Sequence, residues 1–128
     1  MLKGQCLCGA VKYQYHAELE QTILCFCSHC RLAQGGIVAW NSAIQAVHFE
    51  LLSGQDVLQS YEHSALKYRV FCNVCGSPIY SYRDDLKGVL RLRLGTVTEG
   101  KIPEPALEYF SEQKPVFIHS SNCEHADL

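Results

Sequence analysis

Seven of the eight cysteines lie in three short clusters, and this grouping constrains the fold more than any other feature of the sequence. Cys6 and Cys8 form a Cys-X-Cys motif, residues 25–30 (CFCSHC) carry three cysteines, and Cys72 and Cys75 form a Cys-X-X-Cys motif. A disulfide framework would spread its cysteines along the chain, whereas thiols this close together in a reducing compartment more often bind metal or take part in redox chemistry. The clusters therefore predict metal binding.

The first and last clusters can together form one closed metal site. Residues two apart in a strand point to the same side, so Cys6 and Cys8 offer two sulfurs to one point, and the turn at Cys72 and Cys75, followed by Gly76, does the same. A structural zinc takes four ligands in a tetrahedron at about 2.3 Å, commonly from two short chelates far apart in sequence. Its binding free energy, about 10 kcal/mol in zinc peptides, would be coupled to folding. We therefore assign these four cysteines to a structural zinc site.

The central cluster, Cys25, Cys27 and Cys30, is left with three sulfurs and no obvious fourth ligand. Three protein ligands and one open position are typical of a catalytic zinc, because the open position admits water or substrate. Other arrangements remain: Cys27 and Cys30 can instead pair with Cys72 and Cys75, both sites can be purely structural, iron can occupy a four-cysteine site, and Cys27–Cys30 also has the spacing of a redox motif. We expect two zinc sites, of which the open one can be partly occupied.

Apolar and polar residues alternate with a period of two along much of the chain, which predicts an all-β fold. The run AVKYQYHAEL places Val11, Tyr13 and Tyr15 on one face of a half-buried strand. Further strands are predicted in the runs GIVAWN, VHFELLSG, VLQSYEH, LKYRVFC, PIYSYR and GVLRLRLGTV.

The best helical segment is short, covering 28–34 (SHCRLAQ) and ending at Gly35, a residue suited to a helix C-terminus. The length of 128 residues fits one domain, so we expect a single domain over 1–128 built as a small antiparallel sheet assembly. The polar segment 118–128 is predicted to be a loose tail. Sheets this small are rarely stable by burial alone, which gives a structural metal a physical role.

Charge and hydropathy exclude several classes of partner. The net charge is −2 and the 11 Lys and Arg residues are scattered, so the basic stripe of a nucleic-acid-binding protein is absent. No apolar run approaches the roughly 20 residues that span a bilayer, and the N-terminal MLKGQCLCG lacks an apolar signal-peptide core. We expect a cytoplasmic protein that binds neither nucleic acid nor a membrane; the sequence predicts no oligomeric state.

The polar groups nearest to the open site in sequence are Ser28, His29 and Arg31. The planar guanidinium of Arg31 can pair with a substrate carboxylate or neutralise part of the thiolate charge. His29 can relay a proton, because its ordinary pKa lies near 6.5. Both residues are therefore candidates for the catalytic site, with exposed surface residues as the simpler interpretation.

Other polar residues are interpreted as structural. Arg91 and Arg93 alternate with leucines, which predicts the solvated face of a strand. Cys123, with His125, can supply a ligand or an oxidisable thiol, although a frayed tail is the default expectation. The remaining histidines lack metal-ligand spacing and are predicted to be ordinary surface or strand residues: His16, His48, His63 and His119.

Four motifs, GQCLCGAVKY, CFCSHCRLAQGG, FCNVCGSPIY and LRLGTV, occur in this order and resemble the glutathione-dependent formaldehyde-activating (GFA) family, which also includes centromere protein V. The resemblance extends from Gly4 to Val116, and all seven family cysteines have counterparts. It implies a zinc-bearing β-tent fold. It also implies a structural site at Cys6, Cys8, Cys72 and Cys75 and active-site metal ligands at Cys25, Cys27 and Cys30.

The resemblance further implies a carbon–sulfur lyase that combines glutathione with formaldehyde to give S-hydroxymethylglutathione. In that chemistry a metal-bound thiolate adds to the carbonyl of a small aldehyde, and the reverse path cleaves the same bond. The chain departs from the usual family pattern at Phe26, where a histidine is common, and at Val116 and Phe117, near which a tryptophan is common. Because one fold hosts many functions, the alternative is a non-catalytic zinc module that binds another protein.

Overall fold

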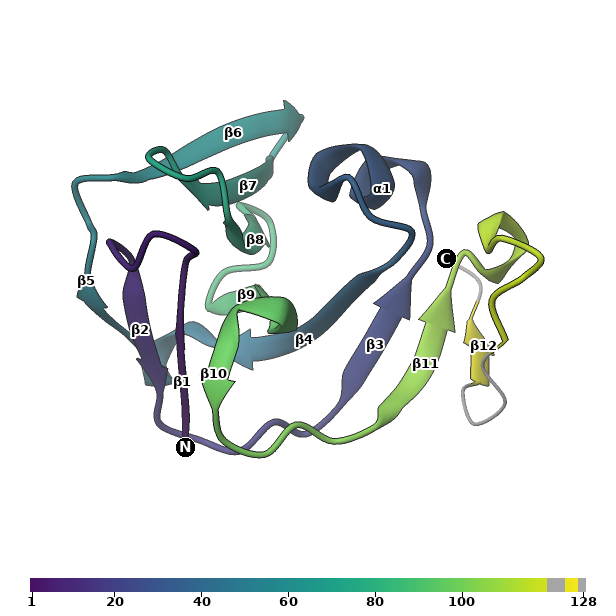
Figure 1. Cartoon of the computed structure of the whole chain (residues 1–128), viewed down its shortest axis with the longest axis horizontal. Helices are drawn as coiled ribbons and strands as arrows, with labels where there is room; N and C mark the ends of the chain where they lie inside the picture. Colours follow the sequence, from purple (N-terminus) through teal and green to yellow (C-terminus); the bar gives the residue numbers. More distant parts are fainter. Residues whose placement is uncertain (120–123, 127–128) are drawn as a thin grey trace.

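Two β-sheets carry most of the regular structure in the computed structural model, which describes residues 1–119 and 124–126 (Figure 1). The smaller sheet has the order β10 (Val97–Glu99), β1 (Leu2–Gln5), β2 (Lys12–Tyr15) and β5 (Phe49–Ser53). The larger sheet has the order β12 (Glu124–Ala126), β11 (Pro105–Tyr109), β3 (Thr22–Cys25), β4 (Ala39–Gln45), β9 (Val89–Arg93), β8 (Pro78–Arg83), β7 (Lys67–Cys72) and β6 (Leu58–Ser64). This arrangement confirms the predicted small all-β fold with at most a short helix.

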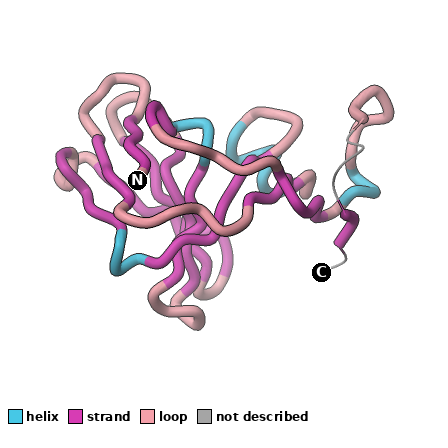
Figure 2. The backbone as a smooth tube through the Cα atoms, turned by 90° about the horizontal axis from the view of Figure 1, so that it is seen from below, coloured by secondary structure: helices cyan, strands magenta, loops and turns pink. Residues whose placement is uncertain are grey.

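The main core lies where the small sheet packs on the large one. Tyr13 and Tyr15 of β2 are buried, whereas Lys12 of the same strand is exposed, as the alternating pattern predicted. Their cluster includes Ile79 from β8 and Leu92 from β9, so side chains of both sheets interdigitate. Figure 2 shows residues 110–119, which follow β11, projecting away from these packed strands.

The directions of the strands differ in part from the antiparallel expectation. β11 runs parallel to both β3 and β12, whereas every other strand pair of the described residues is antiparallel. Parallel neighbours need a long connection, and residues 26–104 between β3 and β11 supply one. Alternation of side chains does not encode strand direction, so the sequence pattern could not reveal this pairing.

Helix α1 (Ser28–Gln34) forms where the sequence predicted it and ends at Gly35, whose φ of 71° is the left-handed conformation of a helix C-terminus. Three short 3-10 turns complete the structure: η1 (Ala46–His48), η2 (Leu94–Thr96) and η3 (Ser111–Gln113). In the described part of the chain, no helix combines the length and apolar character of a membrane span.

The C-terminal segment is described only in part. Its short strand β12 pairs with β11, which places the backbone of His125 opposite Glu108. Cys123 lies outside the described residues, so its predicted role as a ligand or oxidisable thiol stays a prediction.

Candidate metal centres and the adjoining pocket

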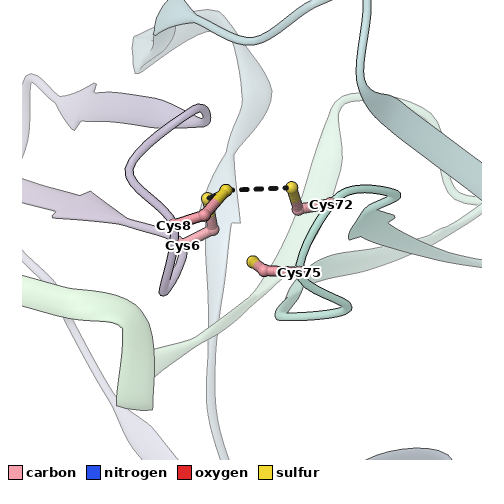
Figure 3. A group of neighbouring side chains, drawn as sticks. All are labelled: Cys6, Cys8, Cys72 and Cys75. Carbon is pink, nitrogen blue, oxygen red and sulfur yellow. Dashed lines mark hydrogen bonds between the residues drawn. The ribbon is translucent and has the colours of Figure 1, made fainter.

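The first group of sulfurs comes from two turns at distant positions in the chain. Cys6 and Cys8 lie in the loop between β1 and β2. Cys72 ends β7 and Cys75 lies in the turn before β8, facing them (Figure 3). All four sulfurs lie within 4.8 Å of one another. The Sγ atoms of Cys6 and Cys8 are 3.6 Å apart, and those of Cys8 and Cys72 are 3.9 Å apart.

Backbone geometry holds each of these turns in the shape of a chelate. The N–H of Val11 donates a hydrogen bond of 3.3 Å to Sγ of Cys6, and the N–H of Gly76 donates one of 2.7 Å to the carbonyl of Cys72. Gly9 and Gly76, each directly after a cluster, adopt φ values of 80° and 83°, which glycine tolerates without strain. The predicted use of Gly76 in a tight turn is therefore confirmed.

Ser77 connects the two turns. Its Oγ accepts a 2.9 Å hydrogen bond from the N–H of Leu7 and lies 3.3 Å from Sγ of Cys75. Because the hydroxyl accepts from Leu7, its own proton is available to the sulfur of Cys75. This hydroxyl contact, with further backbone hydrogen bonds, lowers the pKa of Cys75 to about 5 and so favours the thiolate that binds metal.

The donor chemistry of this group fits a tetrahedral ion. Four ligands at the usual Zn–S distance would have sulfur–sulfur edges of about 3.8 Å. The separations of 3.6 and 3.9 Å agree with that value. Four sulfurs suit zinc and also iron, so the geometry identifies a site that can hold a metal ion.

The second group is local and is built around the start of α1. Cys25 ends β3, Cys27 precedes the helix and Cys30 lies in its first turn, and their sulfurs lie within 4.8 Å of one another. The Sγ of Cys27 caps the helix by accepting a 3.3 Å hydrogen bond from the N–H of Cys30. The same turn that starts the helix therefore gathers the three sulfurs.

Arg69 of β7 places a positive charge beside this trio. Its Nη2 lies 3.9 Å from Sγ of Cys30. The contact with Cys25, followed by Cys27 and Arg69, lowers the pKa of the Cys30 thiol to about 5, although burial opposes this shift. The contact with Cys30 and burial raise the pKa of Cys25. The neighbouring thiols and Arg69 therefore favour a thiolate within the trio.

A pocket of about 530 Å³ adjoins the trio, and Arg69 contributes to both. Its walls come from α1, from the β6–β7 hairpin beside it in Figure 1, and from β8 and β9. The polar lining includes His29 and Gln34 from α1, His63 from β6, and Arg93 at the end of β9. The rings of His29 and His63 lie 5.9 Å apart. The three cysteines are not part of the lining, and Arg69 connects the pocket with the trio through its contact with the Cys30 sulfur.

Comparison with models of known protein families identifies the family of this chain. The family model described as "Glutathione-dependent formaldehyde-activating enzyme" (GFA) matches residues 1–113. The chain belongs to the GFA family. All seven clustered cysteines lie within the matched part, which confirms the resemblance found in the sequence.

A solved relative supports the fold of this GFA family member. A crystal structure of a Rhodobacter sphaeroides protein superposes with a TM-score of 0.63 at 25% sequence identity, covering 79% of this chain and 91% of that chain. No curated protein matches the chain.

The sequence-predicted site residues of this GFA protein fall into two sets. The structure brings the cysteines together in the expected groups of four and three, and it places His29 in the pocket lining. Arg31 is exposed and is not part of that lining, so its predicted role remains untested. Ser28 donates its backbone N–H to the side chain of Gln113, at 3.0 Å.

Three basic residues of the pocket of this GFA protein were not predicted as site residues: His63, Arg69 and Arg93. The prediction that Arg93 lies on a solvated strand face is wrong, because its side chain is buried with 5% exposure, while that of Arg91 is exposed. The face of β9 that carries both residues is covered near its C-terminal end, where Arg93 lines the pocket. The only sequence signal was a basic residue between two leucines, a pattern that indicates an exposed position. The sequence does not show that another element covers this end of β9.

Proposed function

We propose that the protein is a zinc-dependent carbon–sulfur lyase that joins a thiol, such as glutathione, to a small aldehyde, such as formaldehyde, and cleaves the same adduct in reverse. The observation that carries this proposal is a group of three sulfurs with a substrate-sized pocket beside it. Membership of the GFA family supports the thiol and the aldehyde as reactants.

Cys25, Cys27 and Cys30 would hold the zinc, and an ion with three protein ligands keeps one position for a thiol, whose pKa it lowers. The protein contributes the surrounding electrostatics. Arg69, 3.9 Å from the Cys30 sulfur, offsets part of the negative charge that accumulates when thiolates gather. The cap formed by Cys27 keeps the trio fixed to the start of α1.

The reaction balances without an external oxidant or reductant. The substrate thiolate attacks the carbonyl carbon, a carbon–sulfur bond forms, and the π electrons of the carbonyl move to its oxygen. That oxygen takes up one proton, equal to the one that the thiol released, to give an S-hydroxymethyl product. We assign the holding and return of this proton to His29 and His63, because both line the pocket and their rings lie 5.9 Å apart.

A non-catalytic zinc module is the second candidate. It is favoured by the apolar side chains at the tips of the two chelating turns, because Leu7 is 85% exposed and Val74 is 65% exposed. Such residues are typical of a surface that contacts another protein. Two equally inert metal ions, neither accessible to an added thiol, would support this alternative.

The experiment is a titration of the cobalt-substituted protein with glutathione. We expect the visible absorption of the metal centre to change as the thiol enters, and addition of ¹³C-formaldehyde to give the S-hydroxymethyl adduct by NMR. The Cys27→Ser variant, which loses one sulfur of the trio, should lose both responses. Absence of any spectral change at millimolar glutathione would overturn the proposal.

A further inference from the structure

The trio adjoins the segment that follows β11. Strands β3 and β11 are parallel neighbours, with Cys25 opposite Tyr109, so the chain leaves both strands at the same end of the sheet (Figure 1). Cys27 and α1 follow β3, whereas residues 110–114 follow β11. Residues 108–114 are termed the arm. The parallel pairing therefore brings the arm to the three sulfurs.

Two hydrogen bonds join the arm to the loop that carries Cys27. The N–H of Phe26 donates to the carbonyl of Tyr109, at 3.0 Å, and the N–H of Ser28 donates to Oε1 of Gln113, also at 3.0 Å. The two donors are the residues on either side of Cys27. The position of the Cys27 sulfur therefore depends on two acceptors that belong to the arm.

Gln113 caps the start of α1 from a distant part of the chain. The first N–H groups of a helix have no partner within the helix, and a nearby side chain usually accepts one of them. In α1 the sulfur of Cys27 accepts from the N–H of Cys30, and Gln113, 85 residues beyond Ser28, accepts from that residue. Because Cys27 is both a helix cap and a sulfur of the trio, a contact that holds the start of α1 also orients that sulfur.

The arm also packs against the trio. Tyr109 and Phe110 lie against the buried cluster that contains Cys25 and Cys30. Phe110 has a φ of 58° and a ψ of 45°, the left-handed conformation, which is unfavourable for residues other than glycine. This turn leads directly into η3, which carries Gln113 to α1. A large ring at a strained position indicates that the ring has a packing role beside the sulfurs.

A buried ion pair joins the two ends of the arm. Nζ of Lys114 lies 3.0 Å from Oε1 of Glu108, whose side chain is fully buried. The same Nζ lies 5.7 Å from the centre of the ring of Phe26, a buried residue of the loop that carries the trio. Gln113 therefore projects from a segment that is fixed on both sides.

We propose that the arm is the positioning element of the trio, with Gln113 and Phe110 as its positioning residues. Gln113 orients the Cys27 sulfur through Ser28, and Phe110 restrains the rest of the trio by packing. Ligands that are already oriented bind a metal ion more tightly, because less freedom is lost on binding. The inference requires only that the trio holds a metal ion; its consequence for thiol chemistry rests on the proposed function.

Competition with a chromophoric zinc chelator tests the assignment in the protein loaded with zinc at both sulfur groups. We expect zinc to leave in two phases, and the phase that is missing in Cys27→Ser belongs to the trio. Gln113→Leu should weaken zinc binding in that phase by about 5-fold or more, the contribution of one net hydrogen bond, and leave the other phase unchanged.

A conservative variant separates the hydrogen bond from the bulk of the side chain. Gln113→Glu keeps an acceptor for the N–H of Ser28 and places a carboxylate at the start of α1, so it should retain the zinc affinity of the unmodified protein. After cobalt substitution, the visible absorption of the trio's ion should change in Gln113→Leu and be preserved in Gln113→Glu.

Glu112→Leu is the matched control, because Glu112 is exposed and precedes Gln113 in the same turn. It should bind zinc at both groups as the unmodified protein does. Phe110→Gly removes the ring but keeps the turn, since glycine adopts the left-handed conformation without strain. It should weaken only the phase of the trio, and it tests the arm independently if Gln113→Leu does not fold. Circular dichroism checks the fold of each variant.

The outcomes separate this inference from the proposed function. Equal weakening of both phases by Gln113→Leu would indicate a general loss of stability and overturn the positioning role. A loss in Glu112→Leu as large as in Gln113→Leu, or a failure of Gln113→Glu to retain affinity, would overturn it as well. A trio phase that depends on Gln113, in a protein whose metal does not respond to glutathione, would keep the positioning role and overturn the proposed function.

Discussion

The backbone N–H of Leu7 donates a 2.9 Å hydrogen bond to Oγ of Ser77, which joins two turns that are 70 residues apart in the sequence. The same hydroxyl lies 3.3 Å from the Cys75 sulfur. A single small side chain therefore aligns both halves of the four-sulfur group and tunes one of its ligands. Loss of such a contact around a metal site typically lowers metal affinity by about 10- to 100-fold.

Ser77→Ala should weaken metal binding at the four-sulfur group by about 10-fold or more. Without the hydroxyl, the pKa of Cys75 rises toward its ordinary value, and protons compete better with the metal. Competition with a zinc chelator at neutral pH measures the change. Ser60→Ala, at an exposed position of β6, is the control, and equal affinities of the two variants would contradict the prediction.

The two sulfur groups should respond differently to loss of one ligand. Cys72→Ser removes a sulfur from the group that joins the two sheets, so we expect loss of the cooperative fold. Cys27→Ser should keep the fold, because serine is itself a favourable helix cap, and should lose one equivalent of metal. Metal analysis with circular dichroism distinguishes these results. Unfolding of both variants would contradict the prediction and show that both groups are structural.

Local features of the structure could be predicted from the sequence. The cysteine clusters form the two expected sulfur groups because short spacing limits where each sulfur can point. Helix α1 and its end at Gly35 were predicted because helix termini are encoded by one or two residues. Tyr13 and Tyr15 were assigned correctly to the core because β2 has one buried face.

The pocket could not be predicted, because its parts meet only through strand order and register. His63 and Arg69 reach it from a hairpin more than 30 residues beyond the trio. Strand β3 (TILC) and strand β11 (PALEY) show little alternation, so neither was expected, nor was their parallel pairing. Arg93 was misassigned because the alternating pattern does not show which part of a strand another element covers.

A buried ion pair near the trio should contribute more to stability than a surface one. Nζ of Lys114 lies 3.0 Å from Oε1 of Glu108, whose side chain is fully buried. Lys114→Met removes the Lys114 cation from beside that buried carboxylate and should destabilise the protein by about 3 kcal/mol. Lys3→Met, which breaks the exposed 3.9 Å pair with Glu99, should cost less than about 1 kcal/mol. Urea unfolding of both variants provides the comparison, and equal losses would contradict it.

Stability at alkaline pH should depend on Tyr13. Burial raises the pKa of its hydroxyl to about 12, although a 2.7 Å hydrogen bond with Thr96 opposes this shift. Because the folded pKa exceeds the ordinary value near 10, the stabilisation is complete below pH 10 and is lost as the pH rises toward 12.

Tyr13→Phe should therefore show a shallower loss of unfolding free energy between pH 10 and 12 than the unmodified protein, by about 2 kcal/mol over that interval. Urea unfolding at a series of pH values measures the slopes. Tyr61→Phe, at a side chain that is 62% exposed, should behave like the unmodified protein. Parallel curves for all three proteins would refute the assignment.

The separation of Cys6 and Cys8 from Cys72 and Cys75 has a consequence for biosynthesis. A nascent chain holds only half of this ligand set until Cys72, 64 residues after Cys8, has been translated, whereas residues 25–30 complete their trio within one short segment. The three sulfurs of residues 25–30 therefore leave the ribosome before the four-sulfur group can form. The availability of metal after Cys75 has been synthesised would therefore decide whether the β1–β2 hairpin packs on the large sheet.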